Sequence, residues 1–319
     1  MYPAVSIVLF TSLSGAGYGA LVWLGLFQAA DLLPQGRVFG IIAAVLALAC
    51  VVAGLVSSTF HLRHPERVWR AFSQWRSSWL SREGVMAMIT FVPALVFLGG
   101  WILCGAMTDG LRVAGMVLAA CSVVTMFCTA MIYRSLWTIP HWHNDWTVPS
   151  FLVIGLAGGA LLVSSAVALA GGGAVVAPVI LMVGVLMLAL ALFVKAMAWR
   201  DGALRTAEST TGSALGMADR VSSARLLESP NSSENYLQRE MVFRIARKHA
   251  AKLRRLAFVF GIVLPLLLLI LAYVTGGWFG AIAVLVATGL VLAGSLIERW
   301  LFFAEARHKV SLYYGAKSV

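Results

Sequence analysis

The chain has 319 residues, of which 61% are hydrophobic and 12% are charged, and its mean hydropathy is +0.89. A soluble core cannot absorb so much apolar surface. Runs such as IVLPLLLLILAYV are apolar on every side, unlike the alternating strands of a membrane β-barrel. The composition therefore predicts an all-α integral membrane protein.

Eight stretches are long and apolar enough to cross a bilayer as helices, which takes about 20 residues each. They are residues 5–30, 38–60, 84–105, 111–133, 148–170, 176–199, 256–275 and 278–303. The first stretch has no basic segment before it and contains Tyr18 and Gln28, so we expect it to be a retained helix and not a signal peptide. The sequence predicts a bundle of eight transmembrane helices that forms a single membrane domain over 1–319.

The first predicted helix contains the small-residue run SGAGYGA at 14–20, and the predicted spans also contain four cysteines. The glycine run follows no strand, so we interpret it as a surface for close helix packing and not as a phosphate-binding loop. Cys50, Cys104, Cys121 and Cys128 include no CxxC pair. They are therefore expected to be packing residues and not ligands of zinc or an iron–sulfur cluster.

The 24 lysines and arginines are divided unevenly between the two sets of connections. Arg37 and Arg112 lie in one set, and the others lie in 61–82, 134–147, 195–255 and 298–319. The positive-inside rule predicts that the second set and both termini are cytoplasmic. The net charge of +11 does not indicate a nucleic-acid partner, because these residues flank helices where they can face anionic lipid headgroups. We expect a multi-pass protein of the bacterial cytoplasmic (inner) membrane.

The long connection 200–255 has two parts. Residues 201–230 are rich in serine, threonine, alanine and glycine, and we expect them to be mobile. From about 231 to 255, Asn231 is a candidate helix cap with Glu234 three residues later, and Leu237, Met241 and Ile245 form an apolar stripe. The pattern predicts an amphipathic surface helix, either solvated or serving as a docking surface.

Ionisable and aromatic side chains gather where the second, third and fourth spans meet the predicted cytoplasmic face. His61 ends an apolar span, His64 follows it, and Glu83 opens the next span. Because such groups are costly at a membrane edge, they indicate function. We expect His61, Glu83, Tyr133 and His141 to converge on one pocket. The alternative is that they are interfacial anchors.

A quinone site needs an apolar slot, hydrogen-bond donors for the carbonyl oxygens and a group that exchanges protons. Histidine suits proton exchange near neutral pH, and a carboxylate can relay protons. The slot could be walled by Trp69, Phe72, Trp75 and Trp79. Residues 57–84 are therefore predicted to form the mouth of a quinone site. Haem would need histidines at matched depth inside the spans, and no predicted span has one near its centre, so we expect no haem.

Two motifs, STFHLRHPERVWRAFSQWRSSWLSRE and MIYRSLWTIPHWHNDWTVPSFL, resemble the membrane anchor subunits of the dimethyl sulfoxide reductase family, which are related to the polysulfide reductase anchors. The resemblance implies an eight-helix, haem-free subunit. Such a subunit passes electrons between membrane quinone, either ubiquinone or menaquinone, and a partner iron–sulfur subunit joined to a molybdopterin catalytic subunit. It also implies that His61 is the quinol-site histidine, Arg67 the loop arginine and Glu83 the glutamate of the following helix. Arg63 stands where the family often has glycine.

Within that family, SGAGYG, HPERVWRAFSQWRSSWLSREG and ENYLQREMVFRIARKHAAKLRR are most similar to the anchors of quinone-linked sulfite dehydrogenases. This similarity implies electron flow from sulfite to ubiquinone. The candidate quinone-binding residues are His61, His64, Arg67, Trp79, Glu83, Tyr133 and His141, and no catalytic or metal-binding residue is expected in this protein.

Three alternatives remain: a quinol-oxidising anchor of a dimethyl sulfoxide-type reductase, a purely structural assembly anchor, and a secondary transporter. A transporter is disfavoured because Pro93, Pro178 and Pro265 interrupt spans without a neighbouring charge.

Overall fold

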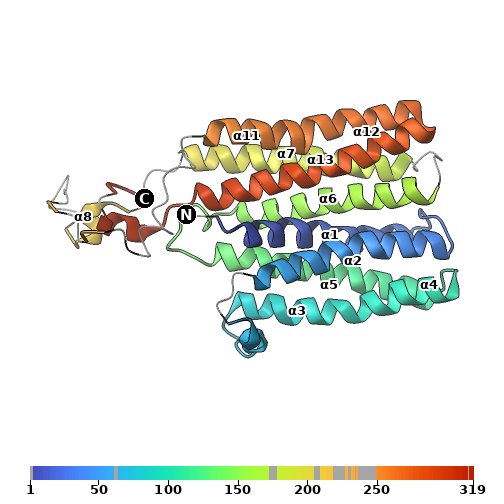
Figure 1. Ribbon diagram of the computed structural model, residues 1–319, viewed down its shortest axis with the longest axis horizontal. Helices are drawn as coiled ribbons and strands as arrows, with labels where there is room; N and C mark the ends of the chain where they lie inside the picture. The colour runs from blue at the N-terminus through green and yellow to red at the C-terminus, as the bar shows by residue number, and fades with distance from the viewer. Residues whose placement is uncertain are drawn as a thin grey trace.

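The computed structural model describes residues 3–60, 64–171, 178–204, 209–217, 227–228, 231–233, 235, 249–314 and 316–319. Eight apolar helical spans lie side by side in one elongated bundle (Figure 1). They are α1 (Val5–Ala29), α2 (Arg37–Thr59), α3–η2–α4 (Trp79–Ala94, Leu95–Gly99, Gly100–Cys104), α5 (Asp109–Arg134), α6 (Thr147–Ala170), α7 (Pro178–Leu204), α11–η3–α12 (Ala250–Phe258, Val259–Val263, Leu264–Thr275) and α13 (Gly277–Ala304). The prediction of an all-α membrane protein with eight spans is confirmed.

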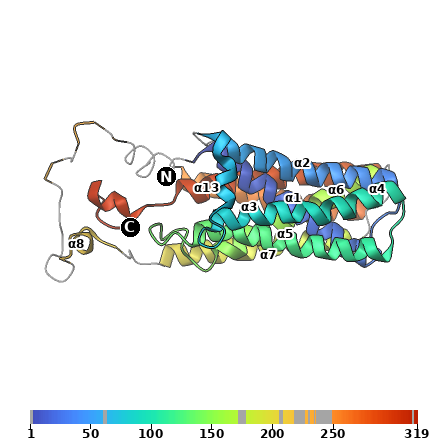
Figure 2. The same cartoon turned by 90° about the horizontal axis from the view of Figure 1, so that it is seen from below.

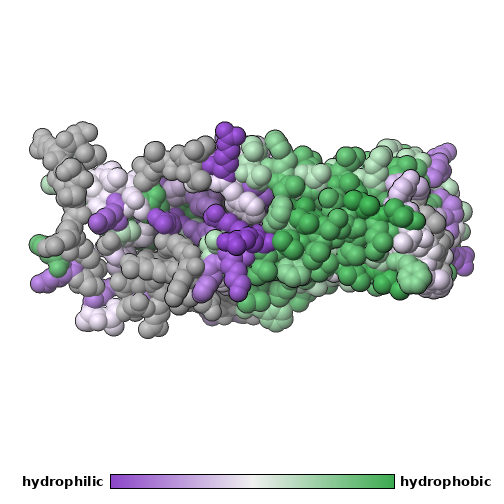
Figure 3. All heavy atoms as spheres, turned by 90° about the horizontal axis from the view of Figure 1, so that it is seen from above, coloured by the Kyte–Doolittle hydropathy of each residue, from purple (hydrophilic) through white to green (hydrophobic). Residues whose placement is uncertain are grey.

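Both termini lie at the same end of the bundle, which we call the terminal face (Figure 1). The short elements α8 (Thr211–Ala214) and η4 (Lys309–Tyr314) extend beyond the spans at this face (Figure 2). Figure 3 shows a broad hydrophobic belt over the spans, with hydrophilic residues towards both ends. Most of the predicted amphipathic helix 231–255 lies outside the described residues, and its last part belongs to α11.

Three spans are at least five residues longer at the terminal face than hydropathy predicts, and one of them is the seventh, which begins at Ala250 and not at residue 256. The third begins at Trp79, five residues before the predicted start, because the side chain of Ser78 accepts a hydrogen bond from the backbone N–H of Ser81 and caps the helix. The sixth continues to Leu204, five residues beyond the predicted end, so Lys195 lies more than two turns inside the helix. A helix satisfies its own backbone at the membrane edge, so polar side chains there do not end it.

The most buried helices, α1 and α6, pack against each other through glycines at the centre of the bundle. A Cβ atom added to Gly19 would overlap the carbonyl oxygen of Gly155, and one added to Gly159 would overlap the backbone of Gly19. Hydrogen in place of a side chain lets the two backbones touch. The predicted close packing of the SGAGYGA run is confirmed.

The spans form two halves with the same pattern of contacts. In the first half, α1 packs on α2 and α5, and α3 packs on α5; in the second, α6 packs on α7 and α13, and α12 packs on α13. The third span of each half contains a proline and one π-helical turn, Pro93 with η2 and Pro265 with η3. Four spans with the same contacts are therefore repeated, and the halves meet where α1 contacts α6.

Candidate functional site

Glu83 is a buried carboxylate near the terminal-face end of α3. Its side chain lies against α5, where the Thr129 hydroxyl donates a hydrogen bond to Glu83 Oε1 (2.6 Å). Along the same seam, the hydroxyl oxygens of Thr90 and Thr125 lie 3.0 Å apart. An ionisable group held inside a membrane helix bundle by one hydroxyl is costly, and such groups usually have a function.

The loop before Glu83 folds as the short helix η1 (Pro65–Phe72) and presents its polar residues at the surface. His64 Nδ1 lies 3.0 Å from Glu66 Oε1, and Arg67 Nε lies 3.8 Å from the same oxygen. More than half of each of these three side chains is exposed. His61 lies outside the described residues.

The aromatic residues of this loop do not surround Glu83 as a closed wall. Trp69 and Trp75 are 63% and 52% exposed, and Phe72 is 38% exposed. The half-buried ring of Trp79 meets the edge of Phe127 at 5.9 Å between centroids. The guanidinium of Arg82 lies 4.2 Å from the Trp79 centroid. Trp79 therefore packs on α5, whereas Trp69 and Trp75 face outwards.

Tyr133 lies one turn beyond Thr129 on α5, in a cluster of aromatic rings. It stacks on Phe151 of α6 at 5.3 Å between centroids and meets Phe302 and Phe303 of α13 at 5.7 and 5.2 Å. Phe302 of this cluster also contacts His141, whose ring lies 6.2 Å from that of Phe302. Tyr133 thus lies between two polar regions of the bundle.

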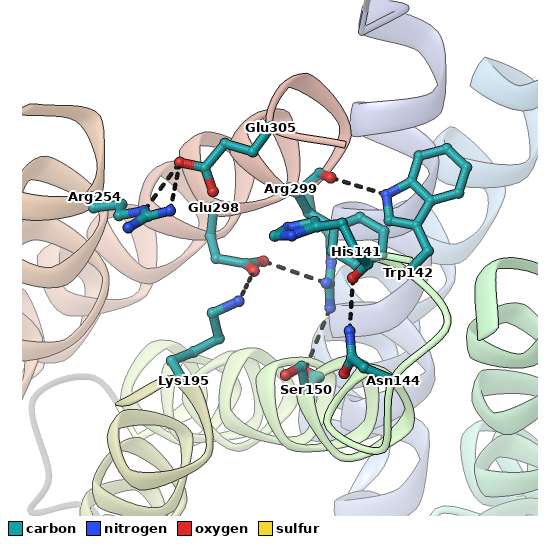
Figure 4. A network of polar contacts seen from close by, with 10 residues as sticks. His141, Trp142, Asn144, Ser150, Lys195, Arg254, Glu298, Arg299 and Glu305 are labelled. Carbon is teal, nitrogen blue, oxygen red and sulfur yellow. Dashed lines mark hydrogen bonds and ion pairs between the residues drawn. The ribbon is translucent and has the colours of Figure 1, made fainter. Parts of the chain in front are cut away.

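The second polar region contains a buried charged triad. Lys195 Nζ of α7 donates to Glu298 Oε1 of α13 (2.6 Å), and Arg299 Nη1 lies 3.3 Å from Glu298 Oε2 (Figure 4). The three side chains are between 2% and 11% exposed. Arg299 also covers the face of Phe151 at 3.6 Å.

The triad and Glu83 lie at the same depth in the bundle. Glu298 is 21 residues after the start of α13 at Gly277, and Glu83 is 21 residues before the end of α4 at Cys104. At 1.5 Å per residue, each is about 31 Å from the opposite end of its span. A hydrocarbon core of about 30 Å, measured from these opposite helix ends, would therefore end near both carboxylates at the terminal face.

A cavity of about 380 Å³ opens beside the triad, between α6, α7 and α13. Its lining includes His141, Asn144, Trp199 and Arg307 as well as Lys195 and Glu298. The loop that carries His141 is fixed in place, since Asn144 Nδ2 donates to the His141 carbonyl oxygen (2.6 Å) and Trp142 Nε1 donates to the Phe302 carbonyl oxygen (3.0 Å) (Figure 4). The terminal face therefore has two separate polar regions, one at Glu83 and one at this cavity.

The pattern of the whole sequence matches a known family. A sequence model described as DMSO reductase anchor subunit (DmsC) matches residues 1–315. The chain belongs to the DmsC family. It is therefore an anchor subunit of a multi-subunit oxidoreductase, and the resemblance noted from the sequence is confirmed.

Two known proteins are similar to this DmsC-family member. The C component of the sulfite dehydrogenase of Allochromatium vinosum is 33% identical over 333 residues, an alignment that covers 98% of the present sequence and 99% of that protein. The C component of the anaerobic dimethyl sulfoxide reductase of Escherichia coli is 27% identical over 121 residues, covering 37% of the present sequence and 41% of that protein.

Sequence reasoning about this DmsC-family member missed the triad. Lys195 lies where the predicted span 176–199 overlaps the connection 195–255 and counts there as a loop cation, and Glu298 then falls inside an apolar span without a predicted partner. The signal was present, since Glu298 and Arg299 are adjacent charges inside the predicted apolar span 278–303.

His141 gives the cavity a measurable pH dependence. Burial and the positive charges of Lys195 and Arg254, partly offset by Glu298, lower its pKa from 6.5 to about 4. Between these values the unfolded protein binds a proton that the folded protein does not, so folded stability falls as the pH drops from about 6.5 to about 4. We expect His141→Gln to reduce this fall in thermal unfolding scans. The exposed His143, changed in the same way, is the control.

Proposed function

We propose that this protein anchors an iron–sulfur subunit and a molybdopterin catalytic subunit to the membrane and passes electrons between the iron–sulfur subunit and membrane quinone. The observation that carries the proposal is the burial of Glu83 against Thr129 near the terminal-face end of α3. Membership of the DmsC family supports the anchoring role.

The residues around Glu83 suit the protons that accompany quinone chemistry. A quinone takes up two protons with two electrons when it is reduced, and one with a long tail stays within the bilayer. Glu83 can hold a proton at the depth where the hydrocarbon ends, and the half-buried Trp79 offers an apolar surface beside it. We propose that His61, at the end of the preceding span, gives or takes the second hydrogen bond or proton, and that Arg67 orients the site.

The remaining candidates are placed differently around this site. His64 contacts Glu66 at the surface, Tyr133 lies one turn from Thr129, and His141 lies beyond the aromatic cluster. We propose that the quinone binds on the Glu83 side of Tyr133. His141 would then belong to the neighbouring cavity.

We infer that the catalytic partner oxidises sulfite and that electrons flow to ubiquinone, since the relative that matches nearly the full length is part of a sulfite dehydrogenase. The shorter match to a component of a dimethyl sulfoxide reductase supports the quinol-oxidising alternative. Transport is less well supported, because the buried charges at Glu83 and the triad lie at the membrane edge and not at its midplane.

Co-purification tests this function. The tagged protein, solubilised gently from its native membrane, is expected to co-purify with one iron–sulfur protein and one molybdopterin protein, each in an amount equal to its own. The particle should reduce a soluble ubiquinone analogue when given sulfite. Purification of the protein without partners would contradict the anchoring role. A complete complex that reduces dyes but no quinone analogue would mean that the protein is a purely structural anchor. An optical spectrum of the protein freed from its partners would show a Soret band if the inference of a haem-free subunit is wrong.

We also infer that the terminal face is cytoplasmic, in the inner membrane of a bacterium. The supporting observation is that, by sequence, all the basic residues except Arg37 and Arg112 belong to the connections on this face or to the adjoining ends of the spans. A phosphatase that folds only in the periplasm, fused after Val319, is expected to be inactive, and a fluorescent protein that folds in the cytoplasm should be bright at the same position. The reverse result would place the partner subunits on the other side.

A further inference from the structure

The Thr129 hydroxyl has two hydrogen-bond acceptors within reach but only one hydrogen to donate. Its oxygen lies 2.6 Å from Glu83 Oε1 and 3.1 Å from the carbonyl oxygen of Thr125, one turn earlier in α5. All three residues are buried. A hydroxyl donates one hydrogen bond and accepts others through its lone pairs. The hydroxyl can therefore turn its hydrogen from one acceptor to the other while its oxygen stays in place.

This hydroxyl is the one side-chain hydrogen-bond partner of Glu83 among the residues that the structure describes. A buried carboxylate is costly without a hydrogen-bond donor. Hydrogen bonds to ionised groups are stronger than those between neutral groups, so the ionised form of Glu83 depends most on Thr129. Glu83 must pass through that form each time it gives up a proton. Thr129 is therefore placed to affect proton exchange at Glu83.

The protonated form of Glu83 can keep the same partner. A proton on Oε1 can be donated to the Thr129 oxygen, and the Thr129 hydroxyl then turns its own hydrogen to the Thr125 carbonyl oxygen. A proton on Oε2 leaves the original hydrogen bond in place. Thr129 loses no proton in either case, and its hydroxyl stays hydrogen-bonded to Glu83 throughout.

We propose that Thr129 is a positioning residue for Glu83, with a hydroxyl that stays hydrogen-bonded to the carboxyl group in both of its protonation states. This inference rests on the proposed role of Glu83 in proton exchange with quinone. Thr129 holds the carboxyl group against α5 while the proton arrives and leaves. A threonine in a helix commonly bonds only the carbonyl oxygen four residues earlier, as Thr275 bonds that of Leu271. The additional contact with a buried carboxylate distinguishes Thr129.

The activities of the assembled complex give the first test. Thr129→Val removes the hydroxyl and nearly keeps the shape of the side chain. Quinone-linked turnover at saturating quinone analogue is expected to fall about 10-fold, the low end of what one hydrogen bond to a charged group contributes. Dye-linked turnover and the KM for the quinone analogue should be unchanged. Thr129→Ser, which keeps a hydroxyl, should restore quinone-linked turnover.

Thr90→Val is the matched control. Thr90 is also buried on the seam between α3 and α5, where its hydroxyl oxygen lies 3.0 Å from that of Thr125. Its removal leaves the Thr125 hydroxyl bonded to the Cys121 carbonyl oxygen (2.9 Å), so both activities should be kept. If Thr90→Val and Thr129→Val lower quinone-linked turnover alike, or if Thr129→Val alone prevents assembly, Thr129 is merely structural and the proposal is overturned.

Infrared spectroscopy of the same complexes tests the hydrogen bond independently of quinone. The C=O band of protonated Glu83 is the band that disappears in Glu83→Gln. Because a hydrogen bond weakens the C=O bond, this band should move to higher frequency in Thr129→Val and return in Thr129→Ser. An unchanged frequency in Thr129→Val, or no such band at any pH, would overturn the proposal. If quinone-linked turnover survives Glu83→Gln, the proposed function of Glu83 fails, whereas the band still decides the role of Thr129.

Discussion

Glu83→Gln is expected to lower quinone-linked turnover of the assembled complex by about 10²-fold or more, which is the low end of what loss of a proton-transfer group costs. The amide has the shape of the carboxylate and can still accept the hydrogen bond from Thr129, so the helices should pack as before. It cannot exchange a proton at neutral pH. Turnover with a soluble dye, which takes electrons from the partner subunits, should be nearly unchanged.

Two further variants complete the comparison with Glu83→Gln. Glu66→Gln removes an exposed carboxylate of the same loop and should leave both activities intact. His61→Ala is expected to give the same split as Glu83→Gln, with quinone-linked turnover lost and dye-linked turnover kept. Equal survival of both activities in the Glu83 and His61 variants would place the quinone site elsewhere. Failure of the complex to assemble would make these residues structural.

Gly159→Ala is expected to destabilise the folded protein by about 3 kcal/mol, the upper part of the usual range for overpacking. The added methyl group would overlap the backbone of Gly19, and no side-chain rotation can relieve a clash with backbone. The α1–α6 seam must therefore open along its length, with loss of the contacts between the two halves. The measurement is the unfolding temperature of the detergent-solubilised complex, together with the yield of monodisperse particles.

Gly289→Ala is the matched control for this change. Gly289 also lies within a membrane helix, α13, but a Cβ atom added there meets nothing within 4 Å. The Gly289→Ala variant should be as stable as wild type or slightly more stable, since alanine favours the helix more than glycine does. If the two variants behave alike, close backbone contact between α1 and α6 does not determine the stability of the bundle.

The fold could be predicted from the sequence because membrane spans depend on local properties. A run of about 20 apolar residues defines a helix wherever its neighbours lie, and the glycines of 14–20 mark a close-packed face by their size alone. The ends of the spans were harder to place. Ser78 caps α3 through a single side-chain hydrogen bond, and hydropathy carries no information about such a contact.

The candidate site could be predicted in part for the same reason. Glu83 was recognised because a carboxylate beside an apolar span is unusual in any fold. The pairing of Lys195 with Glu298 joins residues 103 positions apart and depends on α7 and α13 lying together, which no local pattern reveals. The exposure of Trp69 and Trp75 was also not encoded locally, because it depends on how η1 and the turn after it run over the end of the bundle.

The repeat of four spans has a consequence for sidedness. A unit with an even number of crossings returns the polypeptide to the compartment where it began, so a second copy inserts with the same orientation as the first. Glu83 in one half and Glu298 in the other therefore open towards the same compartment and at the same distance from it. With three spans per unit the second copy would be inverted, and equivalent positions of the two copies would face opposite sides of the membrane.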